Sequence, residues 1–129
     1  FMFGPNANPG ILKNYAALQH APHLQFIDGD YDVFGDGSVI LLSTPGHTPG
    51  HQSLYVKLAK TGGVVVSGDL YHYTQERTLG RIPPREKTTE TAASRRKVEE
   101  FLVKTHSQLW IGHSIDWYRD ALKSPAWYE

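Results

Sequence analysis

The alternation of apolar and polar positions predicts a run of short strands in the first half of the chain. Apolar or alternating stretches are separated by turns rich in glycine and aspartate, a pattern typical of strands joined by tight connections. The predicted strands cover residues 23–27, 31–34, 38–43, 52–58 and 63–67. The apolar run at 39–42 indicates that at least one of these strands is buried.

The second half of the chain contains a stretch with helical periodicity. Thr88 or Thr89 can cap a helix there, and Glu90 suits the positive end of the helix dipole. The helix is expected to continue to about Lys104. Its apolar side is formed by Ala93, Val98, Phe101 and Leu102.

The remaining predicted elements are short. A strand at 108–111 and a helix at 115–122 follow the long helix, and another short helix is predicted at 11–19. Residues 70–87 are expected to be irregular, because two consecutive prolines at 83 and 84 block regular structure.

This order of elements predicts an α+β fold in which helices cover one face of a mixed sheet. The other face of the sheet also needs a cover, and no further predicted element supplies one. We therefore interpret residues 1–129 as a single partial domain whose other half is absent. The unusual start, Phe1 followed by Met2, supports the expectation that the chain was cut there.

Composition narrows the function classes. The 129 residues are 40% hydrophobic and carry thirteen basic and thirteen acidic side chains, so no charge excess points to nucleic acid or a membrane surface. No apolar run is long enough to span a bilayer, and no signal-peptide pattern is visible, which favours a cytoplasmic protein. Because there is no cysteine, any metal must be held by nitrogen and oxygen ligands.

Three candidate metal ligands share one setting. His51, Asp69 and His113 each lie at the end of a predicted strand beside glycine or in a glycine-rich loop. Strand ends often converge on one edge of a sheet, where ligands are held by a rigid backbone. Two imidazoles and a carboxylate suit zinc, manganese or iron better than calcium or magnesium. The alternative is that each histidine is an ordinary loop residue.

Four segments together resemble one enzyme family. Residues 44–51, with the sequence Thr-Pro-Gly-His-Thr-Pro-Gly-His, resemble the signature of the second half of metallo-β-lactamase superfamily hydrolases. The resemblance continues through Gln-Ser-Leu at 52–54, Ser-Gly-Asp at 67–69 and Ile-Gly-His at 111–113. It is strongest to the N-acyl homoserine lactonase-like branch and weaker to glyoxalase II. It implies the C-terminal half of a four-layer αββα sandwich.

The resemblance also implies a dinuclear metal site, with two zinc ions expected and manganese or iron as alternatives. In it, His51 ligates the first ion, Asp69 bridges both ions, and His113 ligates the second. His47 is expected to make only a structural hydrogen bond. The family's other four ligands come from a His-x-His-x-Asp-His motif that does not occur in these residues.

The reaction implied is hydrolysis of an ester, lactone or thioester by a metal-bound hydroxide. The chain alone is expected to be inactive, and the missing half or self-association is expected to cover the sheet. Asp69 and His72 are the expected catalytic residues, while Tyr71 and Tyr73 are expected to contact a small-molecule substrate. Two alternatives remain: a non-catalytic half-fold that only binds, and a sulfur dioxygenase with a single iron.

Overall fold

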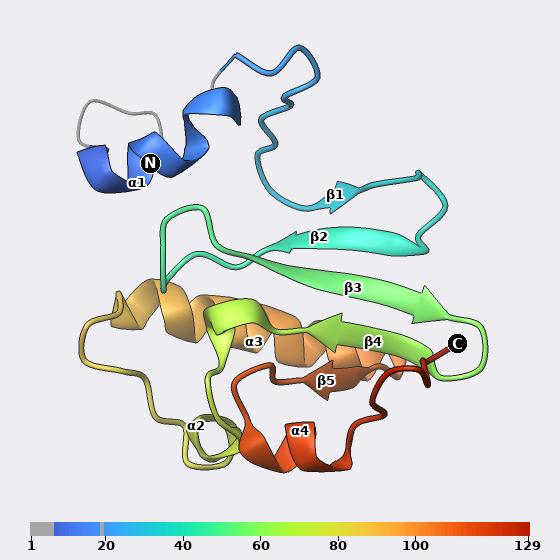
Figure 1. Ribbon diagram of the computed structural model, residues 1–129. Helices are drawn as coiled ribbons and strands as arrows, with labels where there is room; N and C mark the ends of the chain where they lie inside the picture. Colours follow the sequence, from blue (N-terminus) through green and yellow to red (C-terminus); the bar gives the residue numbers. More distant parts are fainter. Residues whose placement is uncertain (1–6, 19) are drawn as a thin grey trace.

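The computed structural model describes residues 7–18 and 20–129 and contains a mixed sheet with helices around it (Figure 1). The elements are α1 (Pro9–Tyr15), the 3₁₀ turn η1 (Ala16–Leu18), β1 (Tyr31–Asp32), β2 (Val39–Ser43), β3 (Gln52–Leu58), β4 (Gly62–Val66), the 3₁₀ turn η2 (Gly68–Leu70), α2 (Thr74–Thr78), α3 (Thr88–Thr105), β5 (Gln108–Trp110) and α4 (Ile115–Asp120). No helix among the described residues is long and apolar enough to cross a membrane.

Most of the predicted elements are confirmed. The strands β2 to β5 and the helix α3 fall within one or two residues of their predicted bounds. The predicted helices at 11–19 and 115–122 are also present, although they are shorter. Gln19, the last residue of the first prediction, and Phe1 lie outside the described residues.

Two predictions of local structure are wrong. Residues 23–27 do not form a strand, and their side chains are mostly exposed, with Phe26 80% accessible. They pair with no strand of the sheet, and the pairing of β1 with β2 begins only at Tyr31. Conversely, the segment expected to be irregular contains α2. This helix is held by side chains that reach α3, including Arg77, which bonds Glu99 at 2.7 Å.

The sheet has the order β1-β2-β3-β4-β5. The first three pairs are antiparallel, and β4 and β5 are parallel. A parallel pair needs a crossover connection, and α3 lies within it. Because β4 and β5 run in the same direction, the segments that follow them leave the sheet at the same edge.

The core lies between the sheet and α3. One face of the sheet presents a row in register, Ile40, Tyr55, Val65 and Leu109. These side chains pack with Val98 and Leu102 of α3, as the predicted apolar side of that helix requires. The ring of Phe101 meets the ring of Tyr55 edge-on, with the centroids 5.0 Å apart.

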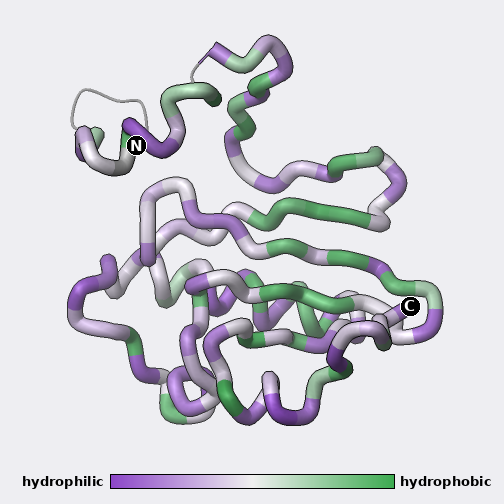
Figure 2. Tube along the Cα trace, in the orientation of Figure 1, coloured by the Kyte–Doolittle hydropathy of each residue, from purple (hydrophilic) through white to green (hydrophobic). Residues whose placement is uncertain are grey.

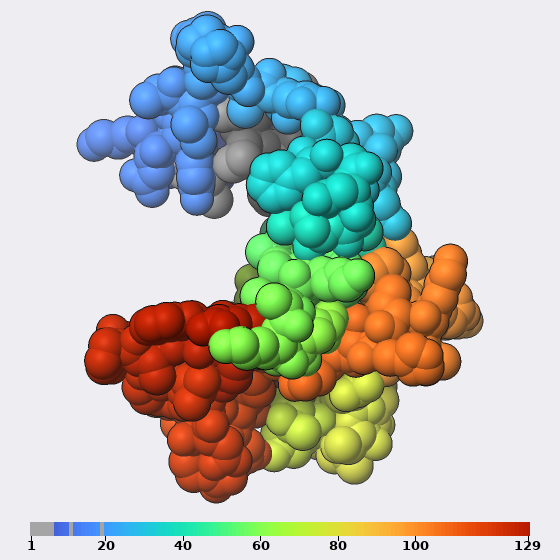
Figure 3. All heavy atoms as spheres, turned by 90° about the vertical axis from the view of Figure 1, so that its right-hand side faces the viewer, coloured from blue at the N-terminus to red at the C-terminus, as the bar shows by residue number. Residues whose placement is uncertain are grey.

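The opposite face of the sheet is apolar and only partly covered. Its central row consists of Tyr31, Leu41, Leu54, Val66 and Trp110. Figure 2 shows that hydrophobic residues are frequent along β2 to β4. Trp117 of α4 and Tyr128 pack on Trp110, with ring centroids 5.4 and 4.5 Å away. The helices thus do not all lie on one face, since α4 lies across the sheet from α3 (Figure 3).

The middle of this face remains open in the part of the chain that the structure describes. In Figure 3 the surface is hollowed between the N-terminal segment and the C-terminal segment, beside β2 and β3. Leu41 and Leu54 lie on this side of those strands and are not buried. The described residues therefore leave part of this face uncovered.

Candidate metal centre

Three loops bring an aspartate and two histidines together at one edge of the sheet. The loop after β2 carries His47, the turn after β4 carries Asp69, and the turn after β5 carries His113. Nε2 of His113 lies 2.9 Å from Oδ1 of Asp69, and Nε2 of His47 lies 3.4 Å from Oδ2. Each oxygen of one carboxylate therefore faces a different imidazole.

His51 lies behind this group, and both of its ring nitrogens contact the backbone. Its Nδ1 is 3.0 Å from the carbonyl oxygen of Thr44 and 2.8 Å from the hydroxyl oxygen of the same residue. Its Nε2 accepts the backbone N–H of Asp69 at 2.9 Å. Burial lowers the pKa of His51, although the Thr44 carbonyl and the charge of Asp69 act in the opposite direction. A neutral ring with Nδ1 protonated satisfies both contacts.

Gly68 makes this arrangement possible. It has φ +54°, a backbone conformation that residues with a side chain rarely adopt. A Cβ at this position would also lie 2.8 Å from Nε2 of His51. The close approach lets the ring reach the amide of Asp69. The structure therefore places His51 as a hydrogen-bonding residue, and it brings His47, which was expected to be structural, to the carboxylate of Asp69.

Two glutamates, one buried and one partly buried, lie behind the histidines. Nδ1 of His47 is 3.3 Å from Oε1 of Glu86, whose side chain is only 1% exposed. Nδ1 of His72 is 3.3 Å from Oε1 of Glu76. His47, His72 and Glu86 offer ligand atoms that all lie within 4.8 Å of one another.

The predicted catalytic residue His72 joins the cluster. Its ring centroid lies 5.2 Å from that of His47 and 5.7 Å from that of His113, and the second pair is stacked. The side chain is 11% exposed, so His72 is a partly enclosed neighbour of the group rather than a free surface residue. The structure thus gathers three histidines around Asp69.

The electrostatics of Asp69 suit a cation. Partial burial alone would raise the pKa of its carboxyl group. The hydrogen bond with His113 and the charges of the neighbouring histidines outweigh burial and hold the pKa below its ordinary value. An anionic carboxylate between imidazoles is a nitrogen and oxygen donor set that fits zinc, manganese or iron.

The two tyrosines expected to contact substrate lie in different environments. Tyr71 is buried, and its hydroxyl donates to Glu99 of α3 at 3.0 Å. Burial raises the pKa of Tyr71, the negative charge of Glu99 adds to the increase, and the guanidinium of Arg95 lies 4.4 Å over the ring. Tyr73 is 55% exposed and lies beside His72, with ring centroids 6.3 Å apart. Of the two, Tyr73 is the one near the histidine cluster.

Glu86 and Glu76 were missed by the sequence interpretation. Both lie in a segment expected to be irregular. Glu76 follows His72 by four residues, a helical spacing that has no meaning in a segment read as irregular. Glu86 reaches His47 across 39 positions of sequence. For Glu86 the local signal was its position just before the predicted cap of α3, which does not indicate a contact with a distant loop.

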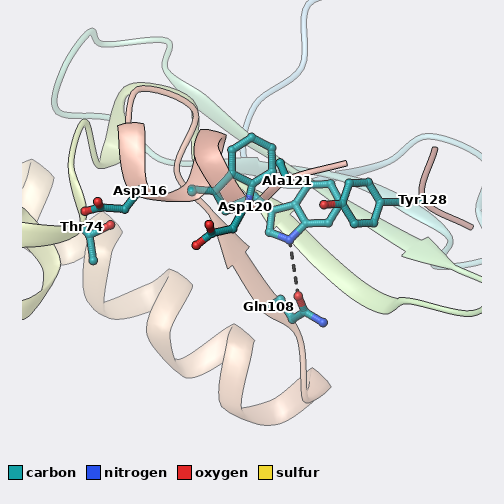
Figure 4. Close-up of a pocket in the computed structure, with 8 residues that line it drawn as sticks. Thr74, Gln108, Asp116, Asp120, Ala121 and Tyr128 are labelled. Atoms are coloured by element: carbon teal, nitrogen blue, oxygen red, sulfur yellow. Dashed lines mark hydrogen bonds between the residues drawn. The ribbon is translucent and has the colours of Figure 1, made fainter. Parts of the chain in front are cut away.

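A groove lies next to the cluster, along α4 (Figure 4). It has a volume of about 370 Å³ and is lined by Thr74, Gln108, Trp110, Asp116, Trp117, Asp120, Ala121 and Tyr128. None of the clustered histidines lines it. Thr74 connects the two places, because its hydroxyl is 2.9 Å from that of Ser114, the residue after His113.

No protein-family model matches the chain. Curated relatives include the N-acyl homoserine lactonase AttM of Azorhizobium caulinodans, with 32% identity over 113 residues, covering 81% of this chain and 42% of that protein. An N-acyl homoserine lactonase of a Bacillus species is 36% identical over 114 residues, covering 79% of this chain and 44% of that protein. The chain thus spans less than half the length of these relatives.

Solved structures of N-acyl homoserine lactone hydrolases also resemble the chain. One is an N-acyl homoserine lactone hydrolase with the product N-hexanoyl-L-homoserine bound at its catalytic metal centre. It has a TM-score of 0.72 and 29% identity, and the match covers 84% of this chain and 43% of that one. A quorum-quenching N-acyl homoserine lactone lactonase also has a TM-score of 0.72, with 30% identity, covering 84% of this chain and 45% of the other.

Proposed function

We infer that this chain contributes to metal-dependent hydrolysis of a lactone. The reason is that it has the metallo-β-lactamase fold and corresponds to the C-terminal part of a lactonase of that superfamily. The observation that carries the proposal is the pair of Nε2 atoms, from His47 and His113, that face the two oxygens of Asp69 at 3.4 and 2.9 Å. The substrate class we propose is an N-acyl homoserine lactone, because the relatives carry that name.

The residues present fit one side of a two-ion site. We propose that Asp69 bridges the ions, that His113 ligates one, and that His47 ligates the other. His51 was predicted as that ligand, but its Nε2 is occupied by the amide of Asp69 and its Nδ1 by Thr44. His47 is the histidine whose free nitrogen reaches the carboxylate. Zinc is the proposed metal, and manganese and iron suit the same donors.

Bound metal supplies an acidified water and a polarised carbonyl oxygen. The chain's own residues hold this chemistry in place. His51 fixes the backbone of Asp69, while Glu86 and Glu76 hold the rings of His47 and His72. We keep His72 as the proposed proton donor to the leaving oxygen, because Glu76 holds its Nδ1 and the other ring nitrogen remains for exchange.

The roles of the tyrosines follow from their positions. Tyr73, exposed and beside His72, is the proposed substrate contact. Tyr71 was also predicted to touch substrate, but its hydroxyl is engaged by Glu99, so we propose that it holds the segment after Asp69 against α3. We further propose that these 129 residues alone hydrolyse little, because the His-x-His-x-Asp-His motif is not among them.

Replacing Asp69 with alanine tests the function. In the full-length protein we expect metal content to fall and hydrolysis of an N-acyl homoserine lactone to drop more than 100-fold. Loss of a residue that only hydrogen-bonds to a metal ligand typically lowers metal affinity or activity about 10–100-fold, and loss of a ligand shared by two ions should lower it more. Metal analysis and a ring-opening assay measure the two effects.

Asp36→Ala is the matched control, because Asp36 lies in the exposed hairpin turn before β2. Unchanged hydrolysis in Asp69→Ala would refute the proposed function. A protein that retains a single iron and consumes oxygen instead of opening lactones would also refute it.

The open sheet face leads to a second expectation. We propose that the part of the longer lactonase that this chain does not include packs on the row of Leu41, Leu54 and Val66. Without that part, the chain should self-associate through this apolar face. Leu54→Lys is expected to weaken self-association at least about tenfold, since a buried leucine contributes about 1.5–3 kcal/mol.

Analytical ultracentrifugation over a range of concentrations measures this effect. Val103→Lys is the control, because Val103 is 76% exposed on α3 and already faces away from the core. If the unmodified chain stays monomeric at every concentration, or if both variants behave alike, this face is not the association surface.

A further inference from the structure

We propose that Glu86 is a positioning residue that fixes the imidazole of His47 with its proton on Nδ1 and its Nε2 directed at Asp69. The inference rests on the proposed function in one respect, since it treats His47 as a metal ligand. The geometry itself is a contact between two side chains and can be tested without metal.

Glu86 is held firmly behind the ring. Its side chain is 1% exposed, and one oxygen, Oε2, accepts the hydroxyl of Thr91 at 3.1 Å. Its backbone N–H donates to the carbonyl of Pro83 at 3.0 Å. The other oxygen, Oε1, lies 3.3 Å from Nδ1 of His47. The carboxylate therefore has a fixed position, and the ring must adapt to it.

The charge of Glu86 decides which atom carries the proton. A buried carboxylate without donors is costly, so each oxygen requires an N–H or O–H partner. Thr91 supplies one, and the described ion pairs of Glu86 are with His47 and, at 3.9 Å, with His72. Asp69 faces Nε2 of His47 at 3.4 Å, but its side chain is 38% exposed to water and also pairs with His113. The buried Glu86 therefore needs the N–H more, and the proton belongs on Nδ1. In the neutral ring, the lone pair is then on Nε2.

The position of Nε2 agrees with metal ligation. Zinc holds nitrogen and oxygen ligands at about 2.0–2.2 Å, so two ligands on one tetrahedral ion lie about 3.3 Å apart. Nε2 of His47 and Oδ2 of Asp69 are separated by 3.4 Å. A metal-bound histidine commonly donates its other N–H to a carboxylate, which orients the ring and raises its basicity. Glu86 is that carboxylate.

His72 is braced separately. Its Nδ1 and its backbone N–H both contact Glu76, and Glu76 is paired with the guanidinium of Arg95 at 2.8 Å. Each of the two histidines therefore has its own glutamate. Removing Glu86 should affect His47 and leave the bracing of His72 largely in place.

The same atoms allow a different use, in which His47, His72 and Glu86 together hold an ion. That ion would lie on the Nδ1 side of His47, against a carboxylate that is 1% exposed and already accepts from Thr91. A hydrolytic ion needs an open coordination position for water. The enclosed side of the ring does not offer one, so we assign Glu86 to hydrogen bonding.

The test compares Glu86→Ala with Glu86→Gln in the full-length protein. Nitrogen NMR of ¹⁵N-labelled histidine, in metal-free protein at alkaline pH, reports which ring nitrogen of His47 carries the proton. His47→Gln identifies its signals. A titration with zinc alone then measures affinity. Glu90→Ala is the control, because Glu90 is near by on the first turn of α3 and pairs only with Lys87 among the described contacts.

We expect Glu86→Ala to move the His47 proton toward Nε2 and to weaken zinc binding about 10–100-fold. Glu86→Gln keeps an acceptor oxygen and should retain the proton on Nδ1 and most of the affinity. Glu90→Ala should resemble the unmodified protein in both measurements.

Two results would overturn the assignment. One is an unchanged proton position in Glu86→Ala. The other is a Glu86→Gln protein that loses zinc as completely as Glu86→Ala while its proton position is intact, because Glu86 would then be a ligand. If no variant, including the unmodified protein, binds zinc, the proposed function fails, and the proton position still decides the role of Glu86.

Discussion

Replacing His47 with alanine is expected to lower both zinc affinity and lactone hydrolysis of the full-length protein more than about 100-fold. This is a larger effect than losing a residue that only hydrogen-bonds to a metal ligand. The reason is that Nε2 of His47 faces Oδ2 of Asp69, where a bridging carboxylate and an imidazole would share one ion. Zinc titration and initial rates at saturating zinc separate a loss of metal from a loss of chemistry.

His51→Gln is the matched comparison within the same loop. His51 joins the Thr44 carbonyl to the Asp69 amide, so its replacement leaves buried polar groups without a partner. This should lower the free energy of unfolding by about 1–3 kcal/mol. In folded protein, saturating zinc should restore most of the activity. Urea unfolding and zinc titration of the same samples measure both effects.

The opposite pattern would reverse the assignment. If folded His51→Gln protein loses zinc and His47→Ala keeps it, then His51 is the ligand, as first predicted from the resemblance. If neither substitution changes zinc affinity, the loop at 44–51 does not contribute to the metal site.

Gly46→Ala is expected to destabilise the fold by about 3 kcal/mol. Gly46 has φ +147°, and an added Cβ would lie 2.2 Å from Oγ1 of Thr91 and 2.8 Å from the backbone of that residue. Backbone atoms of α3 cannot move aside as a flexible side chain could. Strained backbone and overpacking each cost about 1–3 kcal/mol.

The loop is anchored at this point, because Ser94 of α3 donates to the carbonyl of Pro45 at 2.7 Å. Pushing the loop off α3 should therefore displace His47 as well and weaken zinc binding. Gly50→Ala is the control. No atom lies within 4 Å of the Cβ position at Gly50, and its φ is not positive, so alanine should be neutral or stabilise by up to about 1 kcal/mol.

Urea unfolding of both variants measures the free-energy change. Equal stabilities for Gly46→Ala and Gly50→Ala would show that the loop does not pack on α3 as described. A destabilised Gly46→Ala protein that binds zinc with unchanged affinity would show that the anchor does not position His47.

Sequence periodicity predicted the elements whose stability is local or whose pattern is strongly apolar. The strands β2, β3 and β4 have apolar runs or alternation, and α3 has a cap and an apolar side. Residues 23–27 have a similar composition, but a strand also needs a partner along its edge, and that depends on the whole sheet. The helix α2 depends on bonds to α3, which local propensity does not contain.

Within the site, glycine at strand ends drew attention to Asp69 and His113, whose side chains lie 2.9 Å apart. The histidines of the loop could not be separated in this way, because Thr-Pro-Gly-His occurs twice in succession at 44–47 and 48–51. The fold distinguishes the two copies. Gly46 lies against Thr91, Gly50 lies in open space, and only the first histidine has a carboxylate on each side.

The ring of His51 has a consequence for motion. It is one rigid body bonded at one end to the loop that carries His47 and at the other end to the amide of Asp69. His51 and Asp69 are 18 residues apart in the sequence, yet this ring links their two loops. A ligand that pushes on the first loop therefore also shifts the backbone that holds the bridging carboxylate. Two of the proposed ligands, His47 and Asp69, can thus move as one unit when the edge of the sheet flexes.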